Sequence, residues 1–289
     1  EYIWERFTGS MLSPDSLSIL KEWKDIQKAI NHKPFQPESE AYKRFISQTL
    51  LKMERLNEKF PYFDMTNEVE MIKNLIIEKR MEYSIKEIAG IIGADAQKLY
   101  DAPVSILLTD SRRLSFPEQS LFFALQTKTN DGHNYIQGLY KLRVRNFVVS
   151  TFLPEFESMP EANFLVVKDT LKALQKLAAH HRKRFNIPVI GITGSNGKTI
   201  VKEFLYQLLH NEFNIVRSPR SYNSQLGVPL SVWQMSDKNT LGIFEAGISQ
   251  PDEMERLQPI IAPTIGVITN IGEAHQENFI SSTQKCLEK

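Results

Sequence analysis

The sequence predicts an α/β protein in three parts: a helical appendage (residues 1–80), a small α/β domain (81–185) and a parallel-sheet domain with a phosphate-binding loop (186–289). Three observations support this prediction. From Asn186 onward, β-branched apolar runs alternate with helical patterns, which is typical of a parallel sheet with crossover helices. Of the 13 glycines, only Gly9 lies in the first 80 residues. The stretch GITGSNGKT (191–199) stands between a predicted strand and a predicted helix.

Composition limits the classes of function. The chain is 42% hydrophobic and 24% charged with a net charge of +1, so nothing suggests a nucleic-acid or anionic-membrane partner. No apolar run approaches the roughly 18 residues of a membrane span. The single cysteine, Cys286, excludes an internal disulfide and favours a reducing cytoplasm. The start, EYIWERF, has neither a methionine nor a signal-peptide layout and suggests a piece of a longer chain.

Residues 1–80 predict a helical appendage. In EAYKRFISQTLLKMERLNEKF, apolar side chains recur every three to four residues and would form one stripe on a helix: Tyr42, Phe45, Ile46, Leu50, Met53, Leu56 and Phe60. We interpret this segment as a packing element without chemistry.

The next part, 81–185, predicts a short helix and several strands. Ser84 is a candidate N-cap with Glu87 three residues on, and Gly93 would end the helix. VSILLTDSR, SLFFALQ and NFVVS are typical of short strands. The helix TLKALQKLAAHHRKRF ends in five basic residues, interpreted as a solvated last turn suited to the helix dipole, with a phosphate contact as the alternative.

The last part predicts a strand at IPVIGIT and a helix at KTIVKEFLYQLLHN, with Val201, Phe204, Leu205 and Leu208 on one apolar face. FNIVRS, NTLGIFEAG and TIGVITNIG predict further buried strands.

GITGSNGKT departs from the usual phosphate-binding pattern G-x-x-x-x-G-K-[ST], because the first glycine should fall at Ile192. Gly194 and Gly197 nevertheless allow a tight turn that exposes backbone N–H groups at a helix N-terminus. Lys198 would add a charge for nucleotide phosphates, and Thr199 a hydroxyl for Mg²⁺. A chance glycine-rich turn is the alternative, but it does not explain the lysine and threonine together.

Two more strand ends carry suitable groups. Glu245 ends the strand LGIFE, and His275 follows GVITNIGEA. Because ligands of parallel sheets sit at the carboxyl ends of strands, we expect the loop, Glu245 and the 270–275 stretch to share one crevice that holds Mg²⁺. Taken singly, Glu245 could be a strand-end charge and His275 a surface histidine.

These motifs resemble the ATP-dependent Mur ligases of peptidoglycan synthesis. GITGSNGKT looks like their variant loop, displacement included, and SYNSQLGVPL and NIGEAHQENF look like the branch that adds D-alanyl-D-alanine. Other branches carry an acidic residue where this chain has Ala274. TDSRRLSFPEQSLFFALQTKTNDGHNYI is similar to the family's UDP-sugar-binding domain, although Thr127 stands where the family often has glycine. The resemblance covers about 81–289.

The resemblance implies roles for particular residues. ATP phosphates would be bound by Gly194, Ser195, Asn196, Gly197 and Lys198, with Asn270 near the adenine. One Mg²⁺ would be held by Thr199 and Glu245, and a second with help from His275. Ser111 and Arg112 would contact the uridine nucleotide, and Asn223 and Ser224 would face the substrate. Lys289 falls where the family has a carbamylated lysine that bridges to a metal, so Lys198, Glu245, His275 and Lys289 are the candidate catalytic residues.

The implied function is a cytoplasmic ligase that adds D-alanyl-D-alanine to UDP-MurNAc-tripeptide through an acyl phosphate, using ATP and Mg²⁺. The central domain would be truncated, so we expect a fragment without turnover of its own, from a parent that could continue into an alanine racemase domain. A non-catalytic nucleotide-binding fragment and another amide ligase, such as folylpolyglutamate synthetase, are the alternatives. Residues 1–80 look like the C-terminal tail of GSCFA-domain proteins, and we transfer no hydrolase activity from them.

Overall fold

A computed structural model shows a chain that divides into two compact units, Glu1–Lys79 and Arg80–Lys289. The structure describes residues 81–96, 99–114, 116–272 and 278–289. The predicted helical appendage therefore lies outside the described residues. Among the helices that are described, none has the length and apolar character needed to cross a bilayer.

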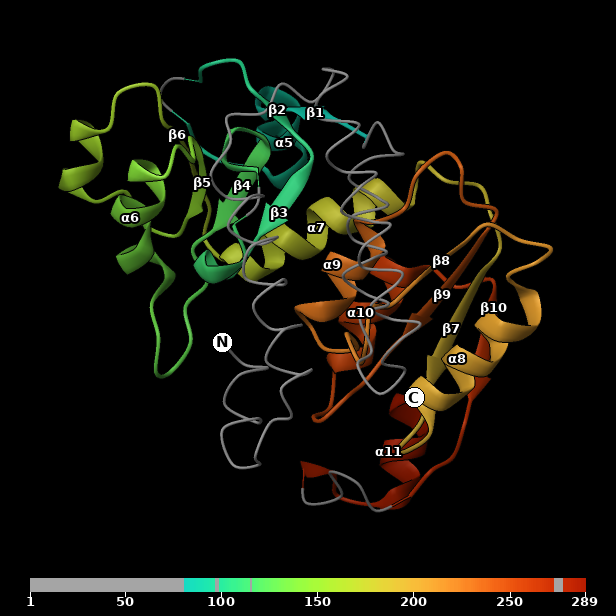
Figure 1. The fold of residues 1–289 in the computed structure, drawn as a ribbon. Coiled ribbons are helices and arrows are strands. Elements are labelled where there is room, and N and C mark those ends of the chain that lie inside the picture. The colour runs from blue at the N-terminus through green and yellow to red at the C-terminus, as the bar shows by residue number, and fades with distance from the viewer. Residues whose placement is uncertain (1–80, 97–98, 115, 273–277) are drawn as a thin grey trace, which may run out of the picture. The chain divides into compact units, whose positions relative to one another are not determined.

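The first sheet of the second unit has four parallel strands in the order β3-β4-β5-β6 (Figure 1). Its strands are β3 (Ile106–Leu108), β4 (Ser120–Phe123), β5 (Asn146–Val149) and β6 (Asn163–Val166). A two-residue antiparallel ribbon, β1 (Tyr83–Ser84) with β2 (Pro103–Val104), lies outside this sheet. Short 3₁₀ turns cover Ser111–Arg113, Pro117–Gln119, Gly132–Tyr135 and Pro154–Ser158. The strand β6 was not predicted, whereas β3, β4 and β5 lie within the predicted strand segments.

Alternate residues of this sheet face two separate cores. Leu121 and Phe123 of β4 pack with α5 (Ile85–Ile92) and α7 (Thr170–Arg182), whereas Phe122 packs on the side of α6 (Ile136–Lys141). Both faces are buried, as expected for parallel strands. The N-cap of α5 is confirmed, since the Ser84 side chain accepts from the Glu87 N–H, and Gly93 ends the helix with a φ of 69°.

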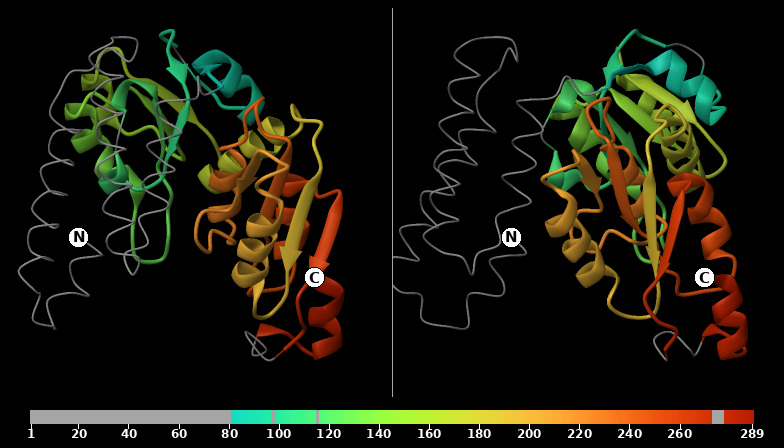
Figure 2. Two further views of the ribbon diagram at one scale, coloured as in Figure 1. Left: turned by 45° about the vertical axis from the view of Figure 1, so that its right-hand side comes forward. Right: turned by 90° about the vertical axis from the view of Figure 1, so that its right-hand side faces the viewer.

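The second sheet is also parallel, in the order β10-β7-β9-β8. Its strands are β7 (Val189–Thr193), β8 (Ile215–Arg217), β9 (Leu241–Glu245) and β10 (Ile265–Ile268). The helices of this part are α8 (Lys198–Leu209), α9 (Gly227–Val232), α10 (Glu253–Ile261) and α11 (Ser282–Glu288). The views of Figure 2 show the four strands side by side, which confirms the predicted α/β class. The sheet has α8 on one face, against Ile190 and Ile192, and α9 and α10 on the other, against Val189.

Two predictions about burial were wrong. On α8, Val201 and Leu205 pack on the sheet, but Phe204 and Leu208 are exposed. The packed face continues through Tyr206 and Leu209, so the buried stripe is rotated from the predicted one. The strand β10 was predicted to be buried, yet its Ile265 and Ile268 are exposed; β10 stands at one edge of the sheet, paired only with β7 among the described strands.

The basic end of α7 is solvated only in part: His180, Lys183 and Arg184 are exposed as interpreted, whereas His181 and Arg182 are buried and contact other parts of the chain, which corrects the interpretation for these two. Arg182 is buried and donates to the carbonyls of Ile261, Ala262 and Phe185. The guanidinium thereby satisfies carbonyls at the C-terminus of α10, the negative end of that helix dipole, and one carbonyl just after its own helix. The positive charge does suit a helix dipole, but mainly that of a neighbouring helix.

His181 is buried beside Arg182 and links three segments. Its Nε2–H donates to the Met235 carbonyl at 3.0 Å, so its Nδ1 accepts from the Tyr83 hydroxyl at 2.8 Å. This pattern requires the neutral imidazole. Burial lowers the pKa of His181 from its ordinary 6.5 to about 4, and the hydrogen bond to Met235 opposes part of that shift.

We expect acid to destabilise the chain through His181. Because the folded pKa lies below the unfolded one, the stabilisation is present above about pH 6.5 and is lost as pH falls toward 4. A shift of this size corresponds to about 3 kcal/mol. Urea unfolding at pH 7 and pH 5 should show a smaller loss of stability for His181→Gln, which keeps both hydrogen bonds without titrating. Parallel losses in the two proteins would contradict this assignment.

Candidate nucleotide and substrate site

The loop after β7 has the geometry of a phosphate-binding turn. Gly194 has a φ of 140° and Gly197 a φ of 79°, conformations that favour glycine, and α8 begins at Lys198. A strand therefore leads into a tight glycine turn and then a helix N-terminus, which is the context that the motif requires.

A second segment, 269–272, holds this loop in place. The Asn270 carbonyl accepts from the Ser195 N–H, and the Asn270 Oδ1 accepts from the Asn196 N–H, both at 2.9 Å. Ser195 and Gly272 also exchange two hydrogen bonds, at 2.9 and 3.1 Å. The structure thus gives Asn270 a role in shaping the loop, and its predicted position near adenine stays a prediction.

Lys198 folds back over the loop. Its Nζ donates to the carbonyl of Gly194 at 2.7 Å and lies 3.4 Å from that of Ser195. Burial lowers the pKa of the Lys198 amine, and the nearby Glu245 carboxylate opposes that shift. In this position the ammonium stands where phosphates seated in the loop would be neutralised.

Thr199 and Glu245 come together as the sequence predicted. The Thr199 hydroxyl donates to Glu245 Oε2 at 3.0 Å, and the Asn223 amide lies 3.4 Å from the same oxygen. Glu245 is fully buried at the end of β9, and its Oε1 makes no regular hydrogen bond with the described residues. A buried carboxylate beside a hydroxyl fits Mg²⁺, which prefers oxygen ligands and keeps several waters. Among the described residues, no three His, Cys, Asp or Glu side chains gather as a metal site.

Glu245 has a charge partner that the sequence analysis missed. Lys202, one turn after Lys198 on α8, is fully buried, with its Nζ 3.0 Å from Glu245 Oε1. The same ammonium donates to the carbonyl of Ser218 at 2.7 Å and to that of Arg220, and lies 3.2 Å from Glu203. Lys202 therefore ties α8 and the loop after β8 to the candidate metal ligand.

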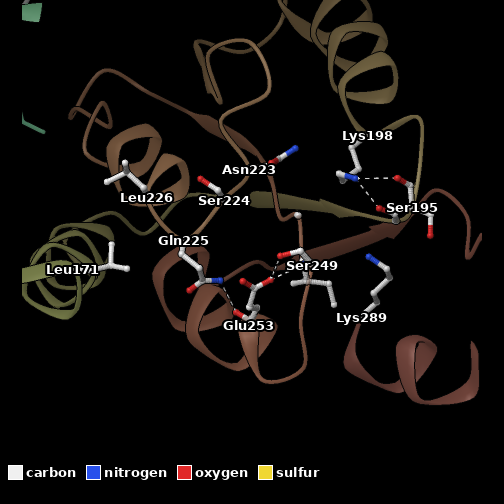
Figure 3. Close-up of a pocket in the computed structure, with 13 residues that line it drawn as sticks. Leu171, Ser195, Lys198, Asn223, Ser224, Gln225, Leu226, Ser249, Glu253 and Lys289 are labelled. Carbon is white, nitrogen blue, oxygen red and sulfur yellow. Dashed lines mark hydrogen bonds between the residues drawn. The ribbon is translucent and has the colours of Figure 1, made fainter. Parts of the chain in front are cut away.

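A cavity of about 440 Å³ opens beside the loop (Figure 3). Gly194, Ser195 and Lys198 line one side, and Asn223 and Ser224 line another. Lys289 also lines this cavity, and burial together with the charges of Lys198 and Lys285 lowers its pKa to about 8. The predicted nucleotide side and substrate side thus share one cavity.

Ser111 and Arg112 do not line this cavity. Arg112 makes bidentate hydrogen bonds to the Asp110 carboxylate, in which its Nε and Nη2 each donate at 2.9 Å. The next residue, Arg113, donates to the hydroxyl of Tyr222, directly before Asn223. The 110–113 turn therefore adjoins the loop that carries the candidate substrate residues, and Arg113 and Tyr222 are contacts that the sequence did not reveal.

The turn at Thr127 shows why a threonine can stand where the family often has glycine. Its hydroxyl accepts from the Asn130 N–H at 3.0 Å, and its N–H donates to the Asn130 carbonyl at 2.8 Å. The φ of Thr127 is not positive, so this turn needs no glycine. Glycine is needed instead at Gly132, where a Cβ would lie 2.7 Å from the Ala124 backbone.

His275 and Ala274 lie outside the described residues, so the predicted imidazole ligand stays a prediction.

Comparison with known proteins assigns the two parts to different families. Residues 192–288 match the Mur ligase middle domain, and residues 23–78 match the C-terminal domain of GSCFA domain proteins. A UDP-N-acetylmuramoyl-tripeptide–D-alanyl-D-alanine ligase of Bacillus subtilis is 31% identical over 199 residues, which cover 68% of this chain and 42% of the relative. Several further relatives carry the same name.

Solved structures agree with this match. A MurF ligase of Thermotoga maritima in complex with ADP is 26% identical, with a TM-score of 0.57 over 64% of this chain and 42% of that one. An Acinetobacter baumannii enzyme, a UDP-N-acetylmuramoylalanyl-D-glutamyl-2,6-diaminopimelate–D-alanyl-D-alanyl ligase, is 25% identical with a TM-score of 0.65, over 73% of this chain and 46% of that one.

A parallel-sheet domain with this loop and with Thr199 against the buried Glu245, matched to the Mur ligase middle domain over residues 192–288, places this part of the chain in the Mur ligase family. Within that family, its similarity is to the MurF type. The chain spans less than half the length of the relatives that it matches.

Proposed function

We propose that this chain is part of an ATP-dependent ligase that joins D-alanyl-D-alanine to UDP-MurNAc-tripeptide in peptidoglycan synthesis. The observation that carries the proposal is the contact of Thr199 with the buried Glu245 carboxylate, next to Lys198, which lines the cavity together with Gly194 and Ser195. The names of the relatives support the substrates. Residues 81–185 would hold the UDP-sugar and 186–289 would bind ATP, in the cytoplasm, with residues 1–80 as a GSCFA-like appendage.

The described residues suit the nucleotide and its metal. Lys198 and the loop N–H groups would bind the phosphates, and Thr199 with Glu245 would hold Mg²⁺, which neutralises charge on the transferred phosphoryl group. Asn223 and Ser224 would orient the peptide carboxylate across the cavity. Ser111 and Arg112 would contact the uridine nucleotide, and His275 would join a second metal.

The chemistry needs two displacements. An oxygen of the peptide carboxylate attacks the γ-phosphorus, and the bond from that phosphorus to ADP breaks, leaving an acyl phosphate. The amine of D-alanyl-D-alanine then attacks the acyl carbon, phosphate leaves with the C–O bond electrons, and the nitrogen loses a proton. Phosphoryl transfer depends mainly on position and charge, which Lys198 supplies at the loop.

Lys289 is chemically suited to the predicted carbamate. Its pKa of about 8 leaves a neutral fraction of the amine at neutral pH, and carbamate formation with carbon dioxide requires that neutral amine. The lowered pKa has its main cause in burial, with Lys198 and Lys285 adding to it. We propose this modification as part of the same function.

A second candidate is a nucleotide-binding module without turnover, since the glycine turn and the position of Lys198 by themselves require only phosphate binding. Turnover by a longer parent chain that is lost in Lys198→Ala would support the ligase. Another amide ligase, such as folylpolyglutamate synthetase, stays an alternative. An added alanine racemase domain stays a prediction.

The test is equilibrium binding of UDP-MurNAc-tripeptide, with UDP-MurNAc-dipeptide and a folate as comparisons, and of ATP with Mg²⁺. We expect saturable binding that favours the tripeptide. Lys198→Ala should weaken ATP binding at least tenfold, because a charge-assisted contact to phosphate is lost, while tripeptide binding changes little. A folded chain that binds neither UDP-sugar would remove the proposed substrate, and unchanged ATP binding in Lys198→Ala would remove the proposed phosphate site.

A further inference from the structure

The turn after β3 carries two arginines and one carboxylate, in Asp110, Arg112 and Arg113. Arg112 donates to both oxygens of Asp110, and these hydrogen bonds hold the pKa of the Asp110 carboxyl below its usual range. Arg113 Nε lies 3.9 Å from Oδ2 of the same carboxylate, which is beyond hydrogen-bonding distance. The charges of Arg112 and Asp110 therefore compensate each other, and Arg113 carries the excess positive charge of this turn.

Arg113 contacts the loop between β8 and α9. Its Nη1 donates to the hydroxyl of Tyr222, and its guanidinium carbon lies 6.0 Å from the centre of the Tyr222 ring. Tyr222 is half-buried and directly precedes Asn223, which lines the cavity. The contact therefore joins the turn that would hold the uridine to the loop that lines the cavity.

The backbone of Tyr222 is fixed in place before a ligand binds. Its N–H donates to the Pro219 carbonyl at 3.1 Å, and a Cβ at Gly227 would lie only 2.9 Å from Tyr222 Cα. The buried Lys202 ammonium donates to the carbonyl of Arg220 in the same loop. A group held in this way costs little ordering entropy when a ligand binds to it.

Both side chains keep hydrogen-bond donors for a ligand. Nη2 of Arg113 makes no hydrogen bond with the described residues, and it forms one arm of a planar fork of N–H groups. The Tyr222 hydroxyl accepts from Arg113, so its own O–H is left to donate. An excess positive charge on a planar fork, next to a hydroxyl donor, is complementary to the oxygens of a phosphate group.

We propose that Arg113 and Tyr222 together bind the diphosphate of the UDP-sugar, so that both parts of the chain, 81–185 and 186–289, hold this substrate. This inference rests on the proposed function. In the ligand, the diphosphate joins the uridine to the sugar that carries the peptide. In the protein, the Arg113–Tyr222 contact joins the proposed uridine residues to the proposed peptide residues, in the same order.

ATP is the other source of a polyphosphate. Its phosphates would lie in the loop after β7, where Lys198 and the backbone N–H groups already neutralise and bind them. Arg113 belongs to a different turn, at the carboxyl end of β3 in the other sheet. We therefore assign Arg113 and Tyr222 to the UDP-sugar.

The experiment compares the binding of UDP and UMP to the full chain by calorimetry, since UMP lacks the phosphate that carries the sugar. We expect UDP to bind roughly tenfold or more tightly, the size of a charge-assisted contact to phosphate. Arg113→Met should bring the two affinities to within about threefold of each other and leave UMP binding nearly unchanged. Arg113→Lys keeps the charge but not the planar fork, so it should retain part of the UDP preference.

Tyr222→Phe removes one neutral donor and should weaken UDP binding by about twofold to fivefold, with UMP binding unchanged. Arg143→Met is the matched control for charge. Arg143 is exposed and lies between α6 and β5, at the amino ends of the strands, so its loss should leave the UDP preference as it is. UDP-MurNAc-tripeptide should lose affinity in Arg113→Met by the same factor as UDP.

Equal binding of UDP and UMP by the unchanged chain, or an equal loss of both in Arg113→Met, would overturn the inference and leave Arg113 as a group that only shapes its turn. A matching loss of ATP and Mg²⁺ binding in Arg113→Met would assign the guanidinium to the ATP site and also overturn it. Both results leave the proposed function intact as long as UDP-MurNAc-tripeptide binds. Failure of the unchanged chain to bind UDP, UMP and the tripeptide contradicts the proposed function together with this inference.

Discussion

Lys202→Met should destabilise the folded chain by about 3–5 kcal/mol, the cost of leaving a buried carboxylate without its charge partner. Both Lys202 and Glu245 are fully buried, and their charged atoms lie 3.0 Å apart. The variant also removes the donor to the carbonyl of Ser218, which accepts from the Lys202 ammonium at 2.7 Å. Urea unfolding of the full chain at neutral pH measures the loss.

The double variant Lys202→Met/Glu245→Gln separates charge from packing. Removing both charges should recover a large part of the lost stability, because an unpaired buried charge costs more than a neutral pair. Glu203→Gln provides the matched control, since Glu203 is partly exposed and also pairs with Arg217, so it should change stability by less than about 1 kcal/mol. A Lys202→Met variant as stable as Glu203→Gln would show that the buried pair contributes little.

The same substitution should uncouple Mg²⁺ from nucleotide binding. Lys202 holds Oε1 of Glu245, which leaves Oε2 directed at the Thr199 hydroxyl. Without that anchor, the gain in nucleotide affinity on adding Mg²⁺ should fall at least tenfold, while affinity without Mg²⁺ stays within about threefold, on the scale of one lost charge-assisted contact. Equal losses with and without Mg²⁺ would indicate general damage rather than a displaced carboxylate.

The sequence could not reveal the role of Lys202, although it did indicate Lys198, Thr199 and Glu245 as site residues. Lys198 and Thr199 belong to a local motif whose chemistry can be read from residue types, and Glu245 ends an apolar strand. Lys202 occupies an ordinary polar position of an amphipathic helix, where a lysine usually faces solvent. It becomes buried only because the 218–224 loop folds over it, and that contact joins residues far apart in the sequence.

The strands and helices were easier to predict from the sequence than the faces that they bury. Runs of β-branched residues predicted the parallel strands, and Ser84 and Gly93 predicted the limits of α5, because both signals are local. Exposure at β10 and the rotated stripe of α8 depend on which elements pack against them, and no local pattern contains that information. His181 and Arg182 make the same point, since their partners, Met235 and Ile261, lie more than fifty residues away.

Gly194→Ala should weaken nucleotide binding by roughly a hundredfold, because the loop cannot keep its shape around a side chain. A Cβ at Gly194 would lie 1.9 Å from Thr269 Oγ1 and 3.1 Å from the Asn270 backbone. Thr269 cannot simply turn away, since its hydroxyl donates to the Asn196 carbonyl at 2.6 Å within the same loop. The φ of 140° adds backbone strain of about 1–3 kcal/mol for a non-glycine residue. Calorimetric titration with ATP and Mg²⁺ measures the effect.

Gly197→Ala is the matched comparison, because it introduces backbone strain without a clash. Its φ is 79°, and the nearest atom to an added Cβ is Thr269 Cβ at 4.0 Å. We expect a loss of about fivefold to tenfold, the cost of one left-handed alanine. Equal effects at the two glycines would refute the steric account. The contrast also explains the displaced motif: Ile192 stands where the usual pattern has glycine because it packs in the sheet core. The close backbone approach occurs two residues later, where the segment after β10 crosses the loop at Gly194.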